Sequence, residues 1–353
     1  MNTHFYKDKP LFGLDIGFNS IKVMQLNNQS SKHTVTGYGV VSFDHKAINN
    51  GVIVDQEHIA KAALELFKNG LVGEITTRRV AFSVPAARTF SRIITLPKLA
   101  PKDIKDAVML EAEQYIPVPL DELYIDYVVT QKSDEKTDVL AVAVPKKVVD
   151  SYLTLTKLLD LEVVVMETTT GATGRLFQST DAHNIPTVLI DFGSVSADIT
   201  IFDQTMRVTG TIPGGGDDIT NLIAKELGVT RDEAHIIKLK YGLSVSKKQK
   251  QIMRALQPLL DQLVREIKRM IRYYEERSNE HHKIEQVVTF GGGANVPGLS
   301  EYLIDNLRLP VRACDPWNHI QFKHIQPPSD VERSMYITAA GLALINPKEI
   351  FQK

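Results

Sequence analysis

Leu14-Asp15-Ile16-Gly17, near the N-terminus, decides the fold because it returns as Ile190-Asp191-Phe192-Gly193 in the second half of the chain. Asp191 lies 176 residues after Asp15, almost half of the 353-residue length. In both copies an apolar strand ends in Asp-x-Gly, turns through small or polar residues and enters a second strand. The same offset pairs Ser20 with Ser196, Val23 with Ile199 and Leu26 with Phe202. Two copies in equivalent contexts seldom arise by chance, so we predict an internal duplication.

The chemistry of this turn points to a phosphate ligand. Gly17 and Gly193 let the backbone approach an anion closely and turn its amides toward it. A carboxylate at the strand end would repel a bare phosphate, but it suits a phosphate bound to Mg²⁺ that keeps several waters. Asp15 and Asp191 are therefore candidates for holding Mg²⁺ through water, one from each hairpin. The alternative is that each Asp only caps its own turn, which is the better explanation for either one alone.

Lys22 follows Asp15 on the strand that leaves the first turn. Its neighbours Ile21 and Val23 are apolar, so Lys22 points to the opposite face of the strand. A solvated lysine and a lysine that reaches back to the phosphates explain this pattern equally well.

Glycine-rich turns mark the rest of the second half. Residues 213–216 end a strand at 206–212 and open a helix at 217–227, and a strand at 287–290 runs into the turn 291–293 with a helix near Pro297. Thr230 and Glu233 predict a capping box at the start of a helix over 231–240. A continuous apolar stripe predicts a long helix over 251–278, in which Pro258 predicts a kink or a break.

The middle of the first half has a different pattern. Residues 102–115 predict a helix with Pro101 at its first position. Ile116-Pro117-Val118-Pro119 ends it, and strands follow at 124–130 and 139–144. This segment reads as a small unit inserted between the two Asp-x-Gly hairpins.

Composition excludes several classes of protein. With 41 Lys+Arg against 42 Asp+Glu, the chain has no global field to recruit nucleic acid or anionic lipid. Cys314 is the single cysteine, which excludes an internal disulfide and Cys-rich metal sites. No run approaches the roughly 18 apolar residues of a membrane span, and residues 1–10 contain no apolar signal region, so a cytoplasmic protein is expected. No Walker, α/β-hydrolase or zinc-protease motif occurs.

These pieces, in this order, resemble the actin/Hsp70/sugar-kinase ATPase superfamily. The match covers a first phosphate loop at 14–22, a linking element at 163–171 with Glu167, a second phosphate loop at 191–198 and an adenosine turn at 291–293. In this superfamily the lysine seven residues after the first-loop Asp contacts phosphate, and Lys22 has that spacing. The resemblance therefore favours the phosphate-contacting alternative for Lys22.

Within the superfamily, nearly the whole chain resembles the type IV pilus assembly protein PilM family. The match is carried by Glu111-Ala112-Glu113-Gln114-Tyr115-Ile116-Pro117-Val118-Pro119-Leu120-Asp121-Glu122, by Leu96-Pro97-Lys98-Leu99, and by the Glu167 and 291–299 motifs. Residues 213–242 also resemble the cell-division protein FtsA, but the amphipathic membrane helix that ends FtsA is not visible here. A small-molecule kinase of the superfamily is less favoured, because no acceptor motif is visible.

The resemblance implies an α/β fold of two actin-like (ribonuclease H-like) domains around a nucleotide cleft, with an FtsA-type inserted subdomain. Subdomain 1A would comprise residues 1–85 and 164–185, the inserted subdomain 1C would comprise 86–163, and the second domain would comprise 186–353, with 2B at about 217–283.

The implied function is a cytoplasmic ATP-binding scaffold of pilus assembly. It would bind the N-terminal tail of the membrane protein PilN in a groove beside the inserted subdomain. It would thereby link PilN to a PilB/PilT-like motor and lie peripherally at the inner face of the membrane through its partners. Self-association is possible in such a family, whereas nucleic-acid binding and direct membrane insertion are not expected.

The implied cofactors are ATP and Mg²⁺. Glu167 would orient an attacking water if hydrolysis occurs, and turnover should be slow because no strong general base is evident. The family helix places a glutamate against the ribose; here the stretch contains Glu233 and His235, so either Glu233 substitutes or the contact is weakened. The candidate nucleotide-binding residues are Asp15, Gly17, Asn19, Ser20, Lys22, Asp191, Gly193, Ser194, Ser196, Gly215, Gly216, Glu233, Lys238, Gly292, Gly293 and Asn295.

Overall fold

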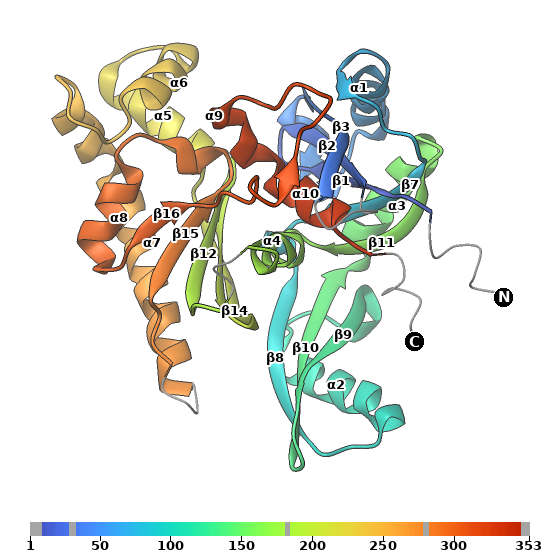
Figure 1. Ribbon diagram of the computed structural model, residues 1–353. Helices are drawn as coiled ribbons and strands as arrows, with labels where there is room; N and C mark the ends of the chain where they lie inside the picture. The colour runs from blue at the N-terminus through green and yellow to red at the C-terminus, as the bar shows by residue number, and fades with distance from the viewer. Residues whose placement is uncertain (1–8, 28–32, 181–183, 278–281, 347–353) are drawn as a thin grey trace.

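The computed structural model describes residues 9–27, 33–180, 184–277 and 282–346. Two α/β halves and a small third sheet make up this part of the chain (Figure 1). The strands of the first sheet, in spatial order, are β11 (Glu162–Thr168), β7 (Arg79–Val84), β1 (Phe12–Ile16), β2 (Ser20–Asn27), β3 (His33–Ser42) and β17 (Ile320–Gln321), and β6 (Leu71–Gly73) pairs with β3. A short separate hairpin joins β4 (Ile48–Asn49) to β5 (Val52–Ile53).

The second sheet repeats the centre of the first. Its strands, in spatial order, are β14 (Thr205–Pro213), β13 (Ser196–Asp203), β12 (Thr187–Phe192), β15 (Gln286–Phe290) and β16 (Val311–Ala313). Asp15 faces Lys22 across the β1–β2 hairpin, and Asp191 faces Asp198 across the β12–β13 hairpin. In both halves the first strand of the hairpin also has a parallel neighbour, β7 or β15. This confirms the predicted duplication.

Helices cover both faces of each sheet. On the outer face of the first sheet, α1 (Gln56–Asn69) and α3 (Lys146–Leu158) pack Ile59 and Tyr152 against Phe12. On the outer face of the second sheet the main helix is α7 (Gln249–Arg277), whose Ile252 and Ile267 join a core that includes Val188. These cores form because apolar side chains alternate along the strands and recur at helical spacing.

Two helices lie between the sheets, α4 (Thr169–Gln178) and α10 (Ile337–Ala343) (Figure 1). They pack against both sheets in one core, which contains Met24 from the first sheet and Leu189 from the second. They cross at close range: a β-carbon on Gly341 would lie 2.0 Å from the carbonyl oxygen of Ala172. Only glycine fits at such a crossing.

The other helices of the second half include the predicted pair. They are α5 (Gly216–Leu227), α6 (Arg231–Lys240), α8 (Leu299–Leu307) and α9 (Asp330–Arg333). The predicted capping box of α6 is confirmed, because the Thr230 and Glu233 side chains each bond the other's backbone N–H. The prediction at Pro258 was a kink or a break; α7 is continuous through Pro258, which excludes the break. Pro258 is exposed, so the carbonyl that it leaves unpaired can bond water.

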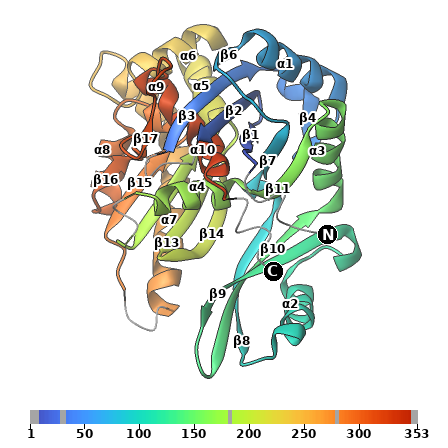
Figure 2. The same ribbon diagram turned by 45° about the vertical axis from the view of Figure 1, so that its right-hand side comes forward.

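The third sheet has the order β8 (Phe90–Pro97), β10 (Lys136–Pro145) and β9 (Leu123–Lys132), and α2 (Pro101–Tyr115) packs on it (Figure 2). Its small core joins Ile94, Val108 and Val139. The predicted helix and strands of this segment are confirmed, whereas the predicted subdomain boundaries stay a prediction. Short 3₁₀ turns complete the fold: η2 (His45–Ala47), η3 (Ala86–Arg88), η4 (Leu120–Glu122), η5 (Gly292–Asn295) and η6 (Ser334–Tyr336).

Candidate functional site

The carboxyl ends of the central strands carry a row of polar side chains. Lys22 on β2 faces Asp15 on β1, and Glu167 on β11 faces Ser83 on β7. The Ser83 hydroxyl donates a hydrogen bond to Asp15 Oδ1 at 3.0 Å, which joins the two pairs. Residues level with one another in neighbouring strands point to the same face, here the face toward α4 and the second half. The row therefore lines the space between the halves.

Lys22 does not point to solvent. Its ammonium donates to Asp15 Oδ2 at 3.1 Å, and its side chain is only 13% exposed. The Lys22 Nζ atom also lies 3.1 Å from the position that a β-carbon of Gly17 would take. A solvated lysine is thus excluded, and Lys22 lies at the turn that was predicted to hold phosphate.

The two Asp-x-Gly turns have the same backbone geometry. Gly17 N–H donates to the carbonyl of Ser20 at 2.9 Å, and Gly193 N–H donates to the carbonyl of Ser196 at 2.9 Å. The turns also meet. The Ser194 hydroxyl donates to Asn19 Oδ1 at 3.4 Å, between residues 175 positions apart in the chain. The two loops thus face each other across the cleft between the halves.

The second loop carries two neighbouring carboxylates where the first carries a carboxylate and an ammonium. Burial, together with the charges of Asp198 and Asp15, raises the pKa of Asp191 to about 7, against the opposing effect of Lys22. Burial also raises the pKa of Asp198 to about 6, while hydrogen bonds from Thr211 and Thr169 oppose that rise. The Thr211 hydroxyl donates to Asp198 Oδ1 at 2.6 Å. A cation between these carboxylates would favour their ionised forms.

Gly291 closes the site beneath Asp191. Its φ of +82° is a conformation that side chains rarely adopt, and a β-carbon there would lie 2.3 Å from Asp191 Oδ1. Glycine is required here for two reasons, the backbone conformation and the close approach of a carboxylate.

The segment at the start of α5 packs on the second loop. Gly216 N–H donates to the carbonyl of Gly193 at 2.9 Å, and a β-carbon on Gly215 would lie 2.5 Å from the Ser194 carbonyl. Lys238 donates its ammonium to the carbonyl of Gly216 at 3.0 Å, and burial lowers its pKa. The structure thus brings Gly215, Gly216 and Lys238, three of the candidate nucleotide-binding residues, to the second loop.

Glu167 has a partner that the sequence did not suggest. Arg175, two turns along α4, donates to Glu167 Oε2 at 2.8 Å. Burial raises the pKa of Glu167, and the charge and hydrogen bond of Arg175 oppose that rise. Glu167 Oε1 is buried without a hydrogen-bond partner among the residues that the structure describes. That oxygen therefore has acceptor capacity that no described residue uses.

Two candidate side chains are engaged in local structure. Glu233 Oε2 accepts from the backbone N–H and the hydroxyl of Thr230, so its carboxylate belongs to the cap of α6. The Asn295 amide donates to the Val331 carbonyl at 2.9 Å and to the Ser334 hydroxyl at 2.8 Å. Their backbone atoms, and those of Gly292 and Gly293 in η5, remain the available contacts for a nucleoside.

The donor set fits Mg²⁺ held mostly by water and phosphate. No group of three or more His, Cys, Asp or Glu side chains in the described ranges could hold a metal ion by itself. Asp15 and Asp191 instead offer oxygens from two loops that face each other, each next to a glycine turn. Mg²⁺ commonly takes one or two carboxylates and completes its shell with water and substrate phosphates.

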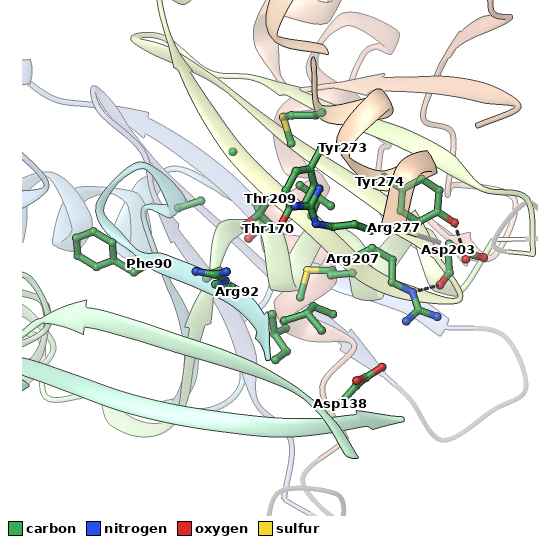
Figure 3. A pocket seen from close by; sticks show the side chains of 18 of the residues that line it. Phe90, Arg92, Asp138, Thr170, Asp203, Arg207, Thr209, Tyr273, Tyr274 and Arg277 are labelled. Atoms are coloured by element: carbon green, nitrogen blue, oxygen red, sulfur yellow. Dashed lines mark hydrogen bonds between the residues drawn. The ribbon is translucent and has the colours of Figure 1, made fainter. Parts of the chain in front are cut away.

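A separate groove lies between the third sheet and the second half (Figure 3). It has a volume of about 870 Å³, and β8 and β14 form its walls. Thr211 lines this groove and also donates to Asp198, so it connects the groove to the second loop. No helix in the described ranges is long and apolar enough to cross a membrane.

Comparison with known proteins agrees with this architecture, in which two similar α/β halves bring their matched turns together, and it defines an actin-like fold. Among solved structures, MreB 5 of Spiroplasma citri bound to AMPPNP aligns with 98% of this chain and 96% of its own, at 11% identity and a TM-score of 0.52. EutJ from Carboxydothermus hydrogenoformans aligns with 94% and 88%, at 15% identity and a TM-score of 0.55. These likenesses show the fold.

The chain belongs to the type IV pilus assembly protein PilM family, whose match covers residues 13–346. The structure described as a PilM-PilN type IV pilus biogenesis complex aligns with 95% of this chain and 98% of its own, at 20% identity and a TM-score of 0.80. The cell division protein FtsA of Pseudomonas aeruginosa is 24% identical over 210 residues, or 53% of this chain. The chain spans about half of that curated relative, 48% of its length.

Proposed function

We propose that the protein is a nucleotide-binding scaffold of type IV pilus assembly, with ATP and Mg²⁺ in the cleft between its halves. The observation that carries the proposal is the meeting of the two matched turns, with Ser194 hydrogen-bonded to Asn19. Two glycine turns that face each other offer amides to a polyphosphate from both sides. Asp15 and Asp191 supply the acidic oxygens that a hydrated Mg²⁺ would contact.

The candidate residues divide by role. The N–H groups of Gly17 and Gly193 bond carbonyls within their own turns, so Lys22 and the other amides around Asn19, Ser20, Ser194 and Ser196 would hold phosphates. The segments of Gly215, Gly216, Lys238, Gly292, Gly293 and Asn295 would flank the nucleoside. Glu167 would orient water through its unpartnered oxygen. Burial raises the basicity of this carboxylate, but its ion pair with Arg175 opposes that rise, which supports slow turnover at most.

The proposed partner is the N-terminal cytoplasmic tail of a PilN-like membrane protein. The support is membership of the PilM family and the similarity to the structure described as a PilM-PilN complex. The tail would bind beside the inserted subdomain and hold the protein at the inner face of the membrane. A PilB/PilT-like motor and a second copy of the chain are further proposed partners.

The test has two independent arms. Isothermal titration with Mg-ATP should show binding to the wild-type chain and its loss in Asp15→Ala combined with Asp191→Ala. Undiminished affinity in that double variant would remove the clamp. In the second arm, a PilN-like N-terminal peptide should retain the chain in a pull-down. Absence of retention, both with and without ATP, would remove the pilus-scaffold proposal.

A further inference from the structure

Two sheets end at the same groove. Within the described ranges, β8 pairs only with β10 and β14 pairs only with β13, so each is the terminal strand of its sheet. Both strands line the groove of about 870 Å³, through residues 89–93 of one and 206–211 of the other (Figure 3). They are not paired with each other. Two strand edges thus face one cavity.

A strand edge presents N–H and C=O groups that seek partners. Natural proteins usually protect such edges, and an accessible edge readily accepts an added strand from another chain. β8 is eight residues long, so its edge extends over roughly 26 Å at about 3.3 Å per residue. That length accommodates an extended peptide of about seven residues. A nucleic acid has no alternating amide and carbonyl groups with which to match such an edge.

The charge of the groove favours an acidic peptide. Arg92, Arg207 and Arg277 line it, and none of them has a carboxylate partner within the described part of the chain. Arg92 lies over the ring of Tyr115 at 4.8 Å, and Arg277 lies over the ring of Tyr273 at 3.9 Å. These stacked guanidinium groups are held in place with their edges free for carboxylates.

The groove's own acids do not cancel this charge. Asp138 accepts a hydrogen bond from Thr95 at 2.7 Å. Asp203 accepts one from the Tyr274 hydroxyl at 2.7 Å and lies 3.2 Å from His282 Nδ1 (Figure 3). Both acids therefore have polar partners. Arg207 Nε donates to the Asp203 backbone carbonyl at 3.2 Å, and among the described residues no carboxylate pairs with any of the three arginines.

We propose that this groove binds an extended acidic segment of a partner protein, which adds as a strand to the edge of β8 and directs its carboxylates toward Arg92, Arg207 and Arg277. Alternate side chains of such a strand point the same way, so acidic residues at every second position meet the arginines. The groove is thus a docking site beyond the nucleotide cleft. It requires no bound ATP, and the occupant that we assign to it is an acidic segment other than a PilN-like tail.

The probe is a fluorescein-labelled peptide of about ten residues in which Glu alternates with Val. Fluorescence anisotropy should show binding to the full chain. Affinity should fall by roughly tenfold or more in the combined variant Arg92→Gln, Arg207→Gln and Arg277→Gln, since each charge-assisted hydrogen bond contributes about 1.5–3 kcal/mol. Arg265→Gln, an exposed arginine of α7 outside the groove, is the matched control and should bind as the wild type does.

Two altered peptides separate the parts of the proposal. Methylation of alternate backbone nitrogens removes donors that strand addition requires, so it should abolish binding while the charge is unchanged. Replacement of Glu by Lys should also abolish it. Hydrogen exchange of the wild-type chain gives a readout that needs no variant, because bound peptide should slow exchange at the β8 amides.

The outcomes are decisive in each arm. Equal binding of the methylated peptide, or of the triple-arginine variant, would overturn the proposal. Displacement of the acidic peptide by an oligodeoxythymidine or by a PilN-like tail would assign the groove to nucleic acid or to that tail and would overturn it as well. Failure of the tail to bind anywhere contradicts the proposed function alone.

Discussion

Lys22 and Asp198 occupy equivalent positions in the two halves of the fold, and they carry opposite charges. Each faces the aspartate of its own Asp-x-Gly turn, Asp15 or Asp191, across a hairpin, and the two positions are separated by the repeat offset of 176 residues. The first loop therefore has a balanced pair and the second has two carboxylates. We expect the phosphate chain to bind nearer the first loop and the cation nearer the second.

The Lys22→Met variant should weaken Mg-ATP binding by roughly 10- to 100-fold, because a charge-assisted hydrogen bond contributes about 1.5–3 kcal/mol. Titration calorimetry measures the change. Lys61→Met, on the exposed face of α1, is the control and should bind normally. The unfolding transition should be recorded too, because loss of Lys22 leaves Asp15 with one partner fewer. Unchanged affinity in a folded Lys22→Met chain would contradict the assignment.

The Asp198→Asn variant should flatten the dependence of stability on pH. The folded-state pKa of Asp191 is raised to about 7 and that of Asp198 to about 6, above the ordinary aspartate value of 3.8. Between pH 4 and 7 the folded chain therefore binds more protons than the unfolded chain. The stabilisation is full below the unfolded pKa and is lost as the pH rises through the folded one.

Urea unfolding at about pH 5 and pH 8 tests this expectation. The wild type should lose stability between these values. Asp198→Asn should lose less, because it removes one of the two carboxylates whose raised pKa values cause the loss. Asparagine can still accept the Thr211 hydrogen bond, so the local structure should be kept. Asp134→Asn, in the exposed turn between β9 and β10, should behave as the wild type does. Identical pH slopes for wild type and Asp198→Asn would contradict the electrostatic coupling.

The Glu167→Gln variant should keep nucleotide affinity and lose hydrolysis. Glutamine retains the shape of the side chain but cannot accept a proton, and such catalytic groups contribute about 10²- to 10⁴-fold. Phosphate release in a single turnover is the measurement. Glu162→Gln, at the exposed start of the same strand, is the control. Equal single-turnover rates in both variants would remove Glu167 from the mechanism.

Gly291→Ala should destabilise the chain by about 1–3 kcal/mol, the cost of a strained backbone conformation. The added β-carbon would also lie 2.3 Å from Asp191 Oδ1, so nucleotide affinity should fall as Asp191 is displaced. Gly292→Ala is a closely matched control, because its β-carbon would meet no atom within 4 Å. Chemical unfolding compares the two. Equal stability would show that the neighbourhood of Gly291 adapts at little cost.

The duplicated hairpins and most helices were predictable because they rest on local patterns. Asp-x-Gly turns, alternating apolar residues and the Thr230–Glu233 cap each leave a signal within a few residues. Asp198 also had a signal in the sequence, since the repeat offset places it in the second half at the position equivalent to Lys22. The break, one of the two outcomes predicted for Pro258, does not occur, because a proline on an exposed helix face leaves the unpaired carbonyl to water.

Contacts between distant segments were not predictable. Ser83 approaches Asp15 from another strand, and Arg175 reaches Glu167 from the helix that follows β11; neither belongs to a motif. The carboxylate of Glu233 was a candidate for ribose by position, yet it serves its own helix cap. The groove between β8 and β14 depends on how two sheets end side by side, which no single segment records.

The close crossing of α4 and α10 is a pivot point between the two halves of the molecule. Gly341 and Ala172 meet backbone to backbone, so the helices can turn against each other but cannot move closer. The start of α4 is bonded to η3, the turn that leads into β8 of the third sheet, because Ala86 N–H donates to the Thr169 hydroxyl at 3.2 Å. The same threonine bonds Asp198 in the second loop. We therefore expect a small rotation of α4 at this crossing to move the second loop and the start of β8 together, which would couple the nucleotide loops mechanically to the peptide groove.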